Sequence, residues 1–182
     1  MAGRRRGAQI RGMCLGLLLV GNGGAMAADA APGAIGLLAP VRYADQAAAK
    51  AAVRDNCELE KTLQDDLLTA LRARGQRVEP VASTNAGDVL EVVIQRVEAA
   101  GSRWTGPKML SVTARLYKDG KPAHLRMLAA WGHGGANLFA GTCQVLHSDS
   151  ADLAAQAAHW LDELDQAAAR SEAAAAASSV VR

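Results

Sequence analysis

The chain has 182 residues, with 20 lysines and arginines against 18 aspartates and glutamates, and aromatic residues make up only 3% of it. Four of the arginines fall within residues 1–27, which contain no acidic residue, so the remainder carries 16 basic residues against 18 acidic ones. A slightly acidic remainder gives no electrostatic reason to expect nucleic acid or anionic lipid as a partner. With so few aromatic residues, the core has to be built from Leu, Val, Ile and Ala.

The N-terminal segment has the three parts of a secretory signal peptide. Three consecutive arginines, Arg4 to Arg6, precede a short apolar run over residues 13–20, and the small-x-small sequence Ala25-Met26-Ala27 follows. The apolar run is shorter than the roughly 20 residues of a membrane-spanning helix. We therefore predict that residues 1–27 are a signal peptide, cleaved after Ala27 or Ala30, and that the mature protein is periplasmic.

The leader carries no lipid-attachment signal. Cys14 lies at the start of the apolar run and not after it, and the residues before it are not the Leu-small-small sequence that permits lipidation. We therefore expect no stable membrane anchor after cleavage. Residues 28–168 are long enough for a single domain, and the Ala- and Ser-rich tail, 169–182, is expected to be a frayed helix end or disordered.

The first half of the mature chain predicts a strand and then a helix. Residues 34–43 have the composition of a strand, in which Pro40 indicates an edge or a bulge. Asp55 and Glu58 have the spacing of a capping box at a helix start. The helix should end at Gly75, a residue typical of the position after a helix, and it carries one apolar stripe formed by Leu59, Leu63, Leu67 and Leu71.

Strand signals follow over residues 76–82, 88–97 and 109–117. The middle segment is apolar on both faces at its centre, which is typical of a central strand, whereas 109–117 alternates between apolar and polar residues. Asp119-Gly120 predicts a hairpin turn leading to a further strand that ends near Trp131.

The C-terminal part predicts a helix from Thr142. Its early segment, residues 147–150, is unfavourable inside a helix and is expected to cap a second helical segment. The element order is strand, helix, strands, helix. The predicted fold is therefore α+β, an antiparallel sheet of about four to five strands with two main helices packed on one face.

Two cysteines remain once the leader is removed, Cys57 and Cys143. In an oxidising compartment such a pair predicts a disulfide. Two alternatives stay open: a pair of buried free thiols, and a zinc site in which Cys57 and Cys143 are joined by His147, one helical turn after Cys143. No fourth zinc ligand and no Cys-x-x-Cys redox motif is present, so we expect no metal, no cofactor and no catalytic residue.

Two glycine-containing loops are candidate partner-binding loops. His133 lies in Gly-His-Gly-Gly, which resembles an esterase oxyanion loop but lacks the accompanying Gly-x-Ser-x-Gly, so a simple turn is the other interpretation. Trp104 and Lys108 lie in a Gly-Pro loop between two predicted strands, where an exposed indole beside a cation would suit an interface. Alternatively, Trp104 folds back over the sheet edge.

The segment from Asp88 to Leu161 resembles a group of uncharacterised proteobacterial envelope proteins. The resemblance rests on Val89-Leu-Glu-Val-Val-Ile, Trp104-Thr-Gly-Pro-Lys-Met-Leu-Ser-Val, Gly141-Thr-Cys-Gln-Val-Leu and Trp160-Leu161. At the level of the fold, the arrangement also resembles the N-terminal domain of the Tol-system periplasmic protein and the curli-secretion lipoprotein. These resemblances imply an accessory or assembly role in the envelope, with an unknown envelope protein or ligand as partner.

Three functions are consistent with these observations. The first is a non-catalytic periplasmic binding or accessory module that uses the sheet face or the loops at Trp104 and His133. The second is a small metal- or thiol-dependent periplasmic enzyme that uses His133, or Cys143 with His147. The third is an assembly factor that self-associates through an exposed sheet edge.

Overall fold

The computed structural model describes residues 34–85, 87–99, 107–132 and 141–180. The predicted leader and the residues Trp104 and His133 lie outside these ranges. The elements are β1 (Ala34–Leu38), β2 (Arg42–Tyr43), the 3-10 helix η1 (Gln46–Ala48), α1 (Ala51–Cys57), α2 (Leu59–Ala73), β3 (Arg77–Val81), β4 (Asp88–Ala99), β5 (Lys108–Lys118), β6 (Lys121–Gly132) and α3 (Thr142–Val180). The predicted order of strand, helix, strands and helix is confirmed.

The sheet is mixed, so the prediction of an antiparallel sheet is wrong in part. The strand order is β3-β1-β4-β5-β6, and β2 pairs with β4. β4, β5 and β6 form the predicted antiparallel meander, but β1 runs parallel to both β3 and β4. The physical reason is the connection between β1 and β3: its two helices form a crossover that returns the chain in the same direction.

The predicted first strand is divided at Pro40. β1 ends at Leu38, the Ala39–Pro40 peptide bond is cis, and β2 resumes at Arg42 beside the centre of β4. Pro40 therefore lies in the bend between two strands. It does not mark a sheet edge, because β1 is flanked by β3 and β4.

The first helical region consists of two helices. Glu58 has φ of 45°, in the left-handed region, and separates α1 from α2. Asp55 lies inside α1, so the predicted capping box is wrong. The predicted apolar stripe is confirmed, because Leu59, Leu63, Leu67 and Leu71 are fully buried, and Gly75 after α2 has φ of 77°.

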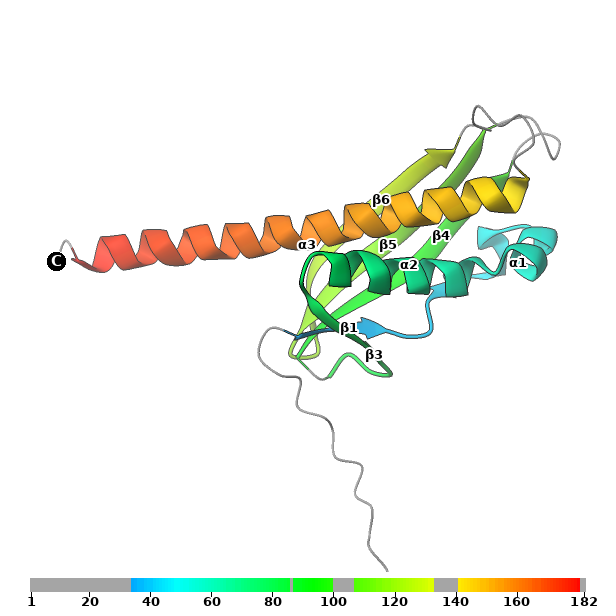
Figure 1. The fold of residues 1–182 in the computed structure, drawn as a ribbon. Coiled ribbons are helices and arrows are strands. Elements are labelled where there is room, and N and C mark those ends of the chain that lie inside the picture. The colour runs from blue at the N-terminus through cyan, green and yellow to red at the C-terminus, as the bar shows by residue number, and fades with distance from the viewer. Residues whose placement is uncertain (1–33, 86, 100–106, 133–140, 181–182) are drawn as a thin grey trace, which may run out of the picture.

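Both long helices cover the same face of the sheet, as Figure 1 shows. α2 and α3 pack side by side, and α3 lies over β5 and β6. The buried core between these layers includes Leu37, Leu90, Val112, Leu128 and Trp160. Trp160 of α3 is the aromatic side chain in this set and is 5% exposed.

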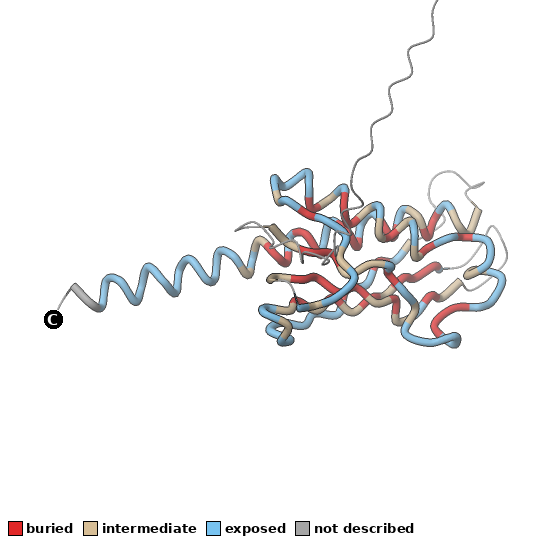
Figure 2. The backbone as a smooth tube through the Cα atoms, turned by 90° about the horizontal axis from the view of Figure 1, so that it is seen from below, coloured by how far each residue is buried: buried red, intermediate tan, exposed pale blue. Residues whose placement is uncertain are grey.

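α3 is continuous through residues 147–150, so the expected second cap within this region is wrong. The helix extends to Val180 through the stretch where the sequence predicted fraying or disorder. From Asp165 to Ser178 every residue is exposed, and this part of α3 projects beyond the body of the domain (Figure 2). No helix in the described part of the chain is long and apolar enough to cross a membrane.

Candidate functional site

A disulfide joins the two helical regions of the chain. Cys57, the last residue of α1, is bonded to Cys143, the second residue of α3, with 5.0 Å between their Cα atoms. Cys57 is only 2% exposed. The bond closes a loop of 86 residues, as the sequence predicted, and ties the start of α3 to the junction between α1 and α2.

The disulfide removes the basis of the zinc alternative. Both sulfur atoms are bonded to each other, and the Nε2 atom of His147 lies 2.7 Å from the backbone carbonyl oxygen of Cys57. Within the described ranges, no three His, Cys, Asp or Glu side chains are grouped to hold a metal ion. His147 instead links α3 to the end of α1.

Within the described ranges, no helix lies over β4, β5 and β6 on the face of the sheet opposite α2 and α3 (Figure 1). The alternation predicted for residues 109–117 sets this face apart from the core. Leu110, Val112, Ala114 and Leu116 are buried toward the helices, whereas Ser111, Thr113, Arg115 and Tyr117 are partly exposed on the other side. We call this second side the uncovered face.

Three large apolar side chains lie exposed on β6. Leu125, Met127 and Trp131 are 58%, 72% and 59% exposed. They occupy alternate positions and pair in register with Arg115, Thr113 and Met109 of β5, so they point to the uncovered face. The intervening Leu128 and Ala130 are buried beneath α3. We call these three residues the β6 row, and such rows of apolar side chains typically mark interaction sites.

A buried carboxylate organises the neighbouring part of the uncovered face. Glu91 of β4 is 7% exposed. Its Oε1 atom accepts a hydrogen bond from Arg42 at 3.0 Å, and its Oε2 atom accepts from Arg115 at 3.1 Å and from the Tyr117 hydroxyl at 3.0 Å. The Tyr117 hydroxyl, followed by the Glu91 charge, raises the pKa of Arg115. This cluster joins β2, β4 and β5 and fixes two arginines on the surface.

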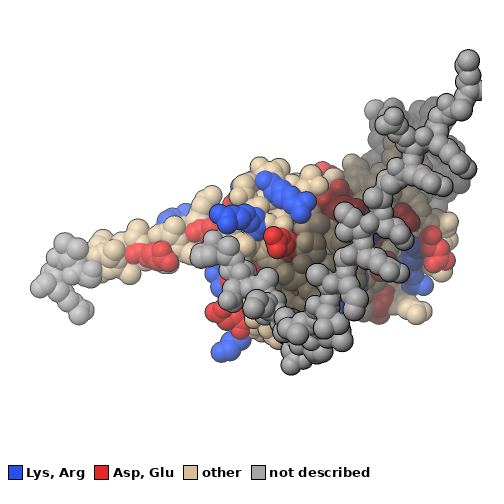
Figure 3. Space-filling view, turned by 60° about the horizontal axis from the view of Figure 1, so that its bottom comes forward, with Lys and Arg blue, Asp and Glu red and all other residues tan. Residues whose placement is uncertain are grey.

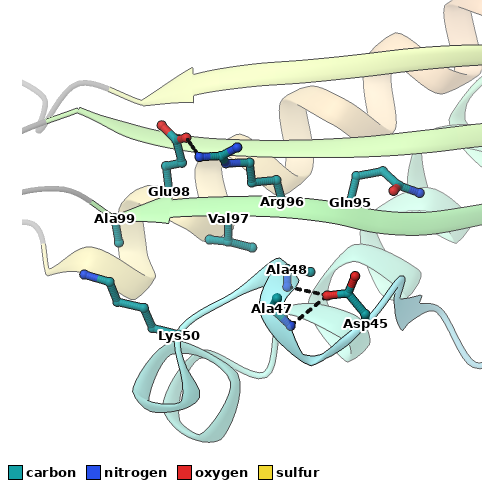
Figure 4. Close-up of a pocket in the computed structure, with 9 residues that line it drawn as sticks. All are labelled: Asp45, Ala47, Ala48, Lys50, Gln95, Arg96, Val97, Glu98 and Ala99. Carbon is teal, nitrogen blue, oxygen red and sulfur yellow. Dashed lines mark hydrogen bonds and ion pairs between the residues drawn. The ribbon is translucent and has the colours of Figure 1, made fainter.

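A pocket of about 480 Å³ lies beside the end of β4, on the side away from β5. On that side the described strands pair with β4 no further than Ile94, which pairs with β2. Figure 4 shows that the pocket is bounded by residues 95–99 of β4 and by the η1 loop. Asp45 caps η1 by accepting from the backbone N–H groups of Ala47 and Ala48. Arg96 and Glu98 form an ion pair at 2.7 Å. These polar groups satisfy one another, and no nucleophile is paired with a base among the lining residues.

Charges are mixed over the surface seen in Figure 3, where basic and acidic side chains lie beside each other and form no single-sign patch. The same view shows that the projecting end of α3 is mostly uncharged.

Of the three residues predicted to form partner-binding loops, the structure describes only Lys108. Trp104 and His133 lie outside the described residues. Lys108 is the first residue of β5 and is only 3% exposed, so it is part of the sheet and not of an exposed loop. The β6 row was not among the sites predicted from the sequence. The available signal was the run Met127-Leu-Ala-Ala-Trp131, which is apolar at both odd and even positions of a predicted strand.

Comparisons with known proteins identify the fold alone. No family model matches the chain, and no curated protein matches it. Among solved structures, the chain is similar to protein XCC0632 from Xanthomonas campestris, of family DUF330, with a TM-score of 0.57, 12% identity, and coverage of 75% of this chain and 88% of that chain. It also matches a PelC dodecamer from Paraburkholderia phytofirmans, with a TM-score of 0.48, 17% identity, and coverage of 69% and 85%. A minor lipoprotein from Acinetobacter baumannii matches with a TM-score of 0.45, 17% identity, and coverage of 73% and 94%.

Proposed function

We propose that this chain is an exported, non-catalytic binding protein of the bacterial envelope, and that it works through the uncovered face of its sheet. The observation that carries the proposal is the β6 row, three large apolar side chains exposed together on one strand. A folded protein in water gains nothing from such exposure unless another molecule covers it.

The disulfide supports export. Disulfides persist in oxidising compartments such as the periplasm and are rare in the cytosol. The bond between Cys57 and Cys143 therefore agrees with the signal peptide predicted for residues 1–27. The same bond engages both cysteines of the mature chain, which leaves the thiol-dependent enzyme without a free thiol.

The first experiment tests the compartment. Protein recovered from the periplasm is alkylated with and without prior reduction, and its intact mass is measured. We expect a chain beginning at Ala28 or Ala31, with Cys57 and Cys143 alkylated only after reduction. An uncleaved chain, or cysteines that react without reduction, contradicts the export part of the proposal.

The second experiment tests the binding surface. A photo-reactive amino acid replaces Met127, which is 72% exposed, and the matched control places it at Ala167 on the exposed part of α3. On irradiation of intact cells, we expect a covalent adduct from position 127 that weakens when Leu125→Ser is added, and a weaker adduct from position 167. Equal adducts from both positions, or none from position 127, contradict binding through the β6 row.

A further inference from the structure

The two edges of the sheet differ in how well they are protected. β3 forms one edge with only five residues, and its Pro80 lacks an N–H group, which removes a donor that a further strand would need. β6 forms the other edge with 12 residues, and no strand of the described chain pairs with its outer side. Its only proline, Pro122, lies at the turn end. Residues 123–132 therefore carry all their backbone donors and acceptors. One of them, the carbonyl oxygen of Ala129, accepts a long hydrogen bond of 3.5 Å from Gln156 of α3, which a pairing strand would replace.

The side chains of this edge restrict its partner. Arg126 is already neutralised by an ion pair with Glu163 of α3. From Met127 to Gly132 the strand carries no charge. An uncharged strand selects neither a basic nor an acidic partner, and burying a charge against it would be unfavourable. The complementary surface is another uncharged apolar strand with a free edge, and within the described ranges β6 itself is such a strand.

We propose that β6 pairs antiparallel with β6 of a second copy, so that the two sheets join into one across a twofold axis. The register is set by Pro122, which cannot donate to the new ladder. Pairing centred on Leu128 uses residues 124–132 of both copies and avoids Pro122. It places Leu125 opposite Trp131 and Met127 opposite Ala129 of the second copy.

This register brings the two β6 rows together on the uncovered face. Cross-strand pairs of aromatic and aliphatic side chains stabilise sheets, and the pairing of Leu125 with Trp131 occurs twice in a twofold arrangement. Arg126 faces Ala130 of the second copy, so no like charges oppose each other. The inference rests on the proposed function of the β6 row and names its occupant.

The predicted dimer is weak. Each copy contributes only residues 124–132 to the new pairing, which is fewer than the roughly 20–30 residues a side of a standard interface. We therefore expect a dissociation constant of about 1–100 µM.

Sedimentation velocity of the processed, disulfide-bonded protein over about 1–500 µM tests this, a range that spans the expected constant. We expect a monomer at the lowest concentration and a dimer at the highest. Met127→Glu should weaken dimerisation at least tenfold, and because Met127 is exposed this variant should fold, which far-UV circular dichroism checks. The matched control is Thr113→Glu, which places the same charge on the neighbouring strand of the same face and should leave the edge free to pair.

Mixing Met127→Cys protein with Ala129→Cys protein tests the register. The mixed disulfide should form faster than the Met127→Cys homodimer disulfide, and the native cysteines do not interfere because they are bonded to each other. A protein that stays monomeric, or a dimer unaffected by Met127→Glu, overturns the inference. If Thr113→Glu also abolishes the dimer, the two copies associate by stacking their uncovered faces, and this result would likewise overturn edge pairing. A monomer that still forms adducts from position 127 with a different protein in cells retains the proposed function and refutes only self-association.

Discussion

Removing the disulfide should lower the stability of the domain by a large fraction. The bond closes a loop of 86 residues, and the chain-entropy model gives a loop of that length about 4.6 kcal/mol at 25 °C. Removal of native disulfides typically costs about 2–5 kcal/mol. A domain of this size has a total stability of about 5–15 kcal/mol, so we expect the reduced protein to be folded only marginally.

Urea unfolding followed by far-UV circular dichroism measures this effect, with and without a phosphine reductant. With a slope of about 2 kcal/mol per molar urea, a loss of about 4 kcal/mol moves the midpoint down by about 2 M. The control is the double variant Cys57→Ala, Cys143→Ala, whose midpoint should be low and insensitive to reductant. Alanine is chosen because Cys57 is buried, where a serine hydroxyl would need a hydrogen-bond partner.

The reasoning is refuted if the reduced protein, with two free thiols shown by alkylation, unfolds at the same urea concentration as the oxidised protein. That result would mean that the packing of α2 against α3 alone holds the helix layer together.

Three further substitutions test the packing and charges described above. Gly36→Ala should destabilise by about 1–3 kcal/mol in urea unfolding, because the added Cβ would lie 2.8 Å from a Val81 methyl carbon, whereas Gly141→Ala, with no atom within 4 Å, should change stability by less than about 1 kcal/mol. Glu91→Gln should destabilise by about 1–3 kcal/mol, because it removes the charge that two arginines share, and a smaller effect in the same assay would count against a structural role for this cluster. Burial, followed by the charge of Glu60, raises the pKa of Tyr43 to about 12 from its ordinary 10.0. The folded state then keeps a proton that the unfolded state loses, so stability should fall as the pH rises from about 10 to 12, and Tyr43→Phe should remove this loss and the late phase of the tyrosine absorbance titration.

Local structure was predictable where neighbouring residues determine it. The stripe from Leu59 to Leu71 repeats every four residues and is fully buried. Asp119 and Gly120 have φ of 50° and 75°, the conformation that a two-residue hairpin turn requires and that these residue types favour. The disulfide followed from counting cysteines after removal of the leader.

Features that depend on distant parts of the chain were not predictable in the same way. The five residues of β1 carry no signal for strand direction, and their parallel pairing follows from the crossover to β3. The break at Glu58 also has no local signal, because glutamate has no special preference for the left-handed region.

The β6 row was missed for a related reason. Met127 and Leu128 are both apolar, and only the position of α3 decides that Leu128 is buried while Met127 is exposed. The sequence of β6 predicts a strand with two apolar faces, and it does not tell which face a helix will cover. Lys108 shows the opposite error: its place in a Gly-Pro loop sequence predicts exposure, but strand pairing begins at this residue and it is buried.

The position of α3 also connects the disulfide to the proposed binding surface. The bond at Cys143 fixes the start of α3 beside the end of α1, and from there the helix lies over β5 and β6 on one face only. The bond restrains the position of α3, and in this arrangement the β6 row is already exposed in the folded state. A surface that is already in its binding conformation loses less conformational entropy on association. Reduction of the disulfide should therefore weaken self-association as well as stability, and a dimer of unchanged affinity in reduced but still folded protein would separate the two effects.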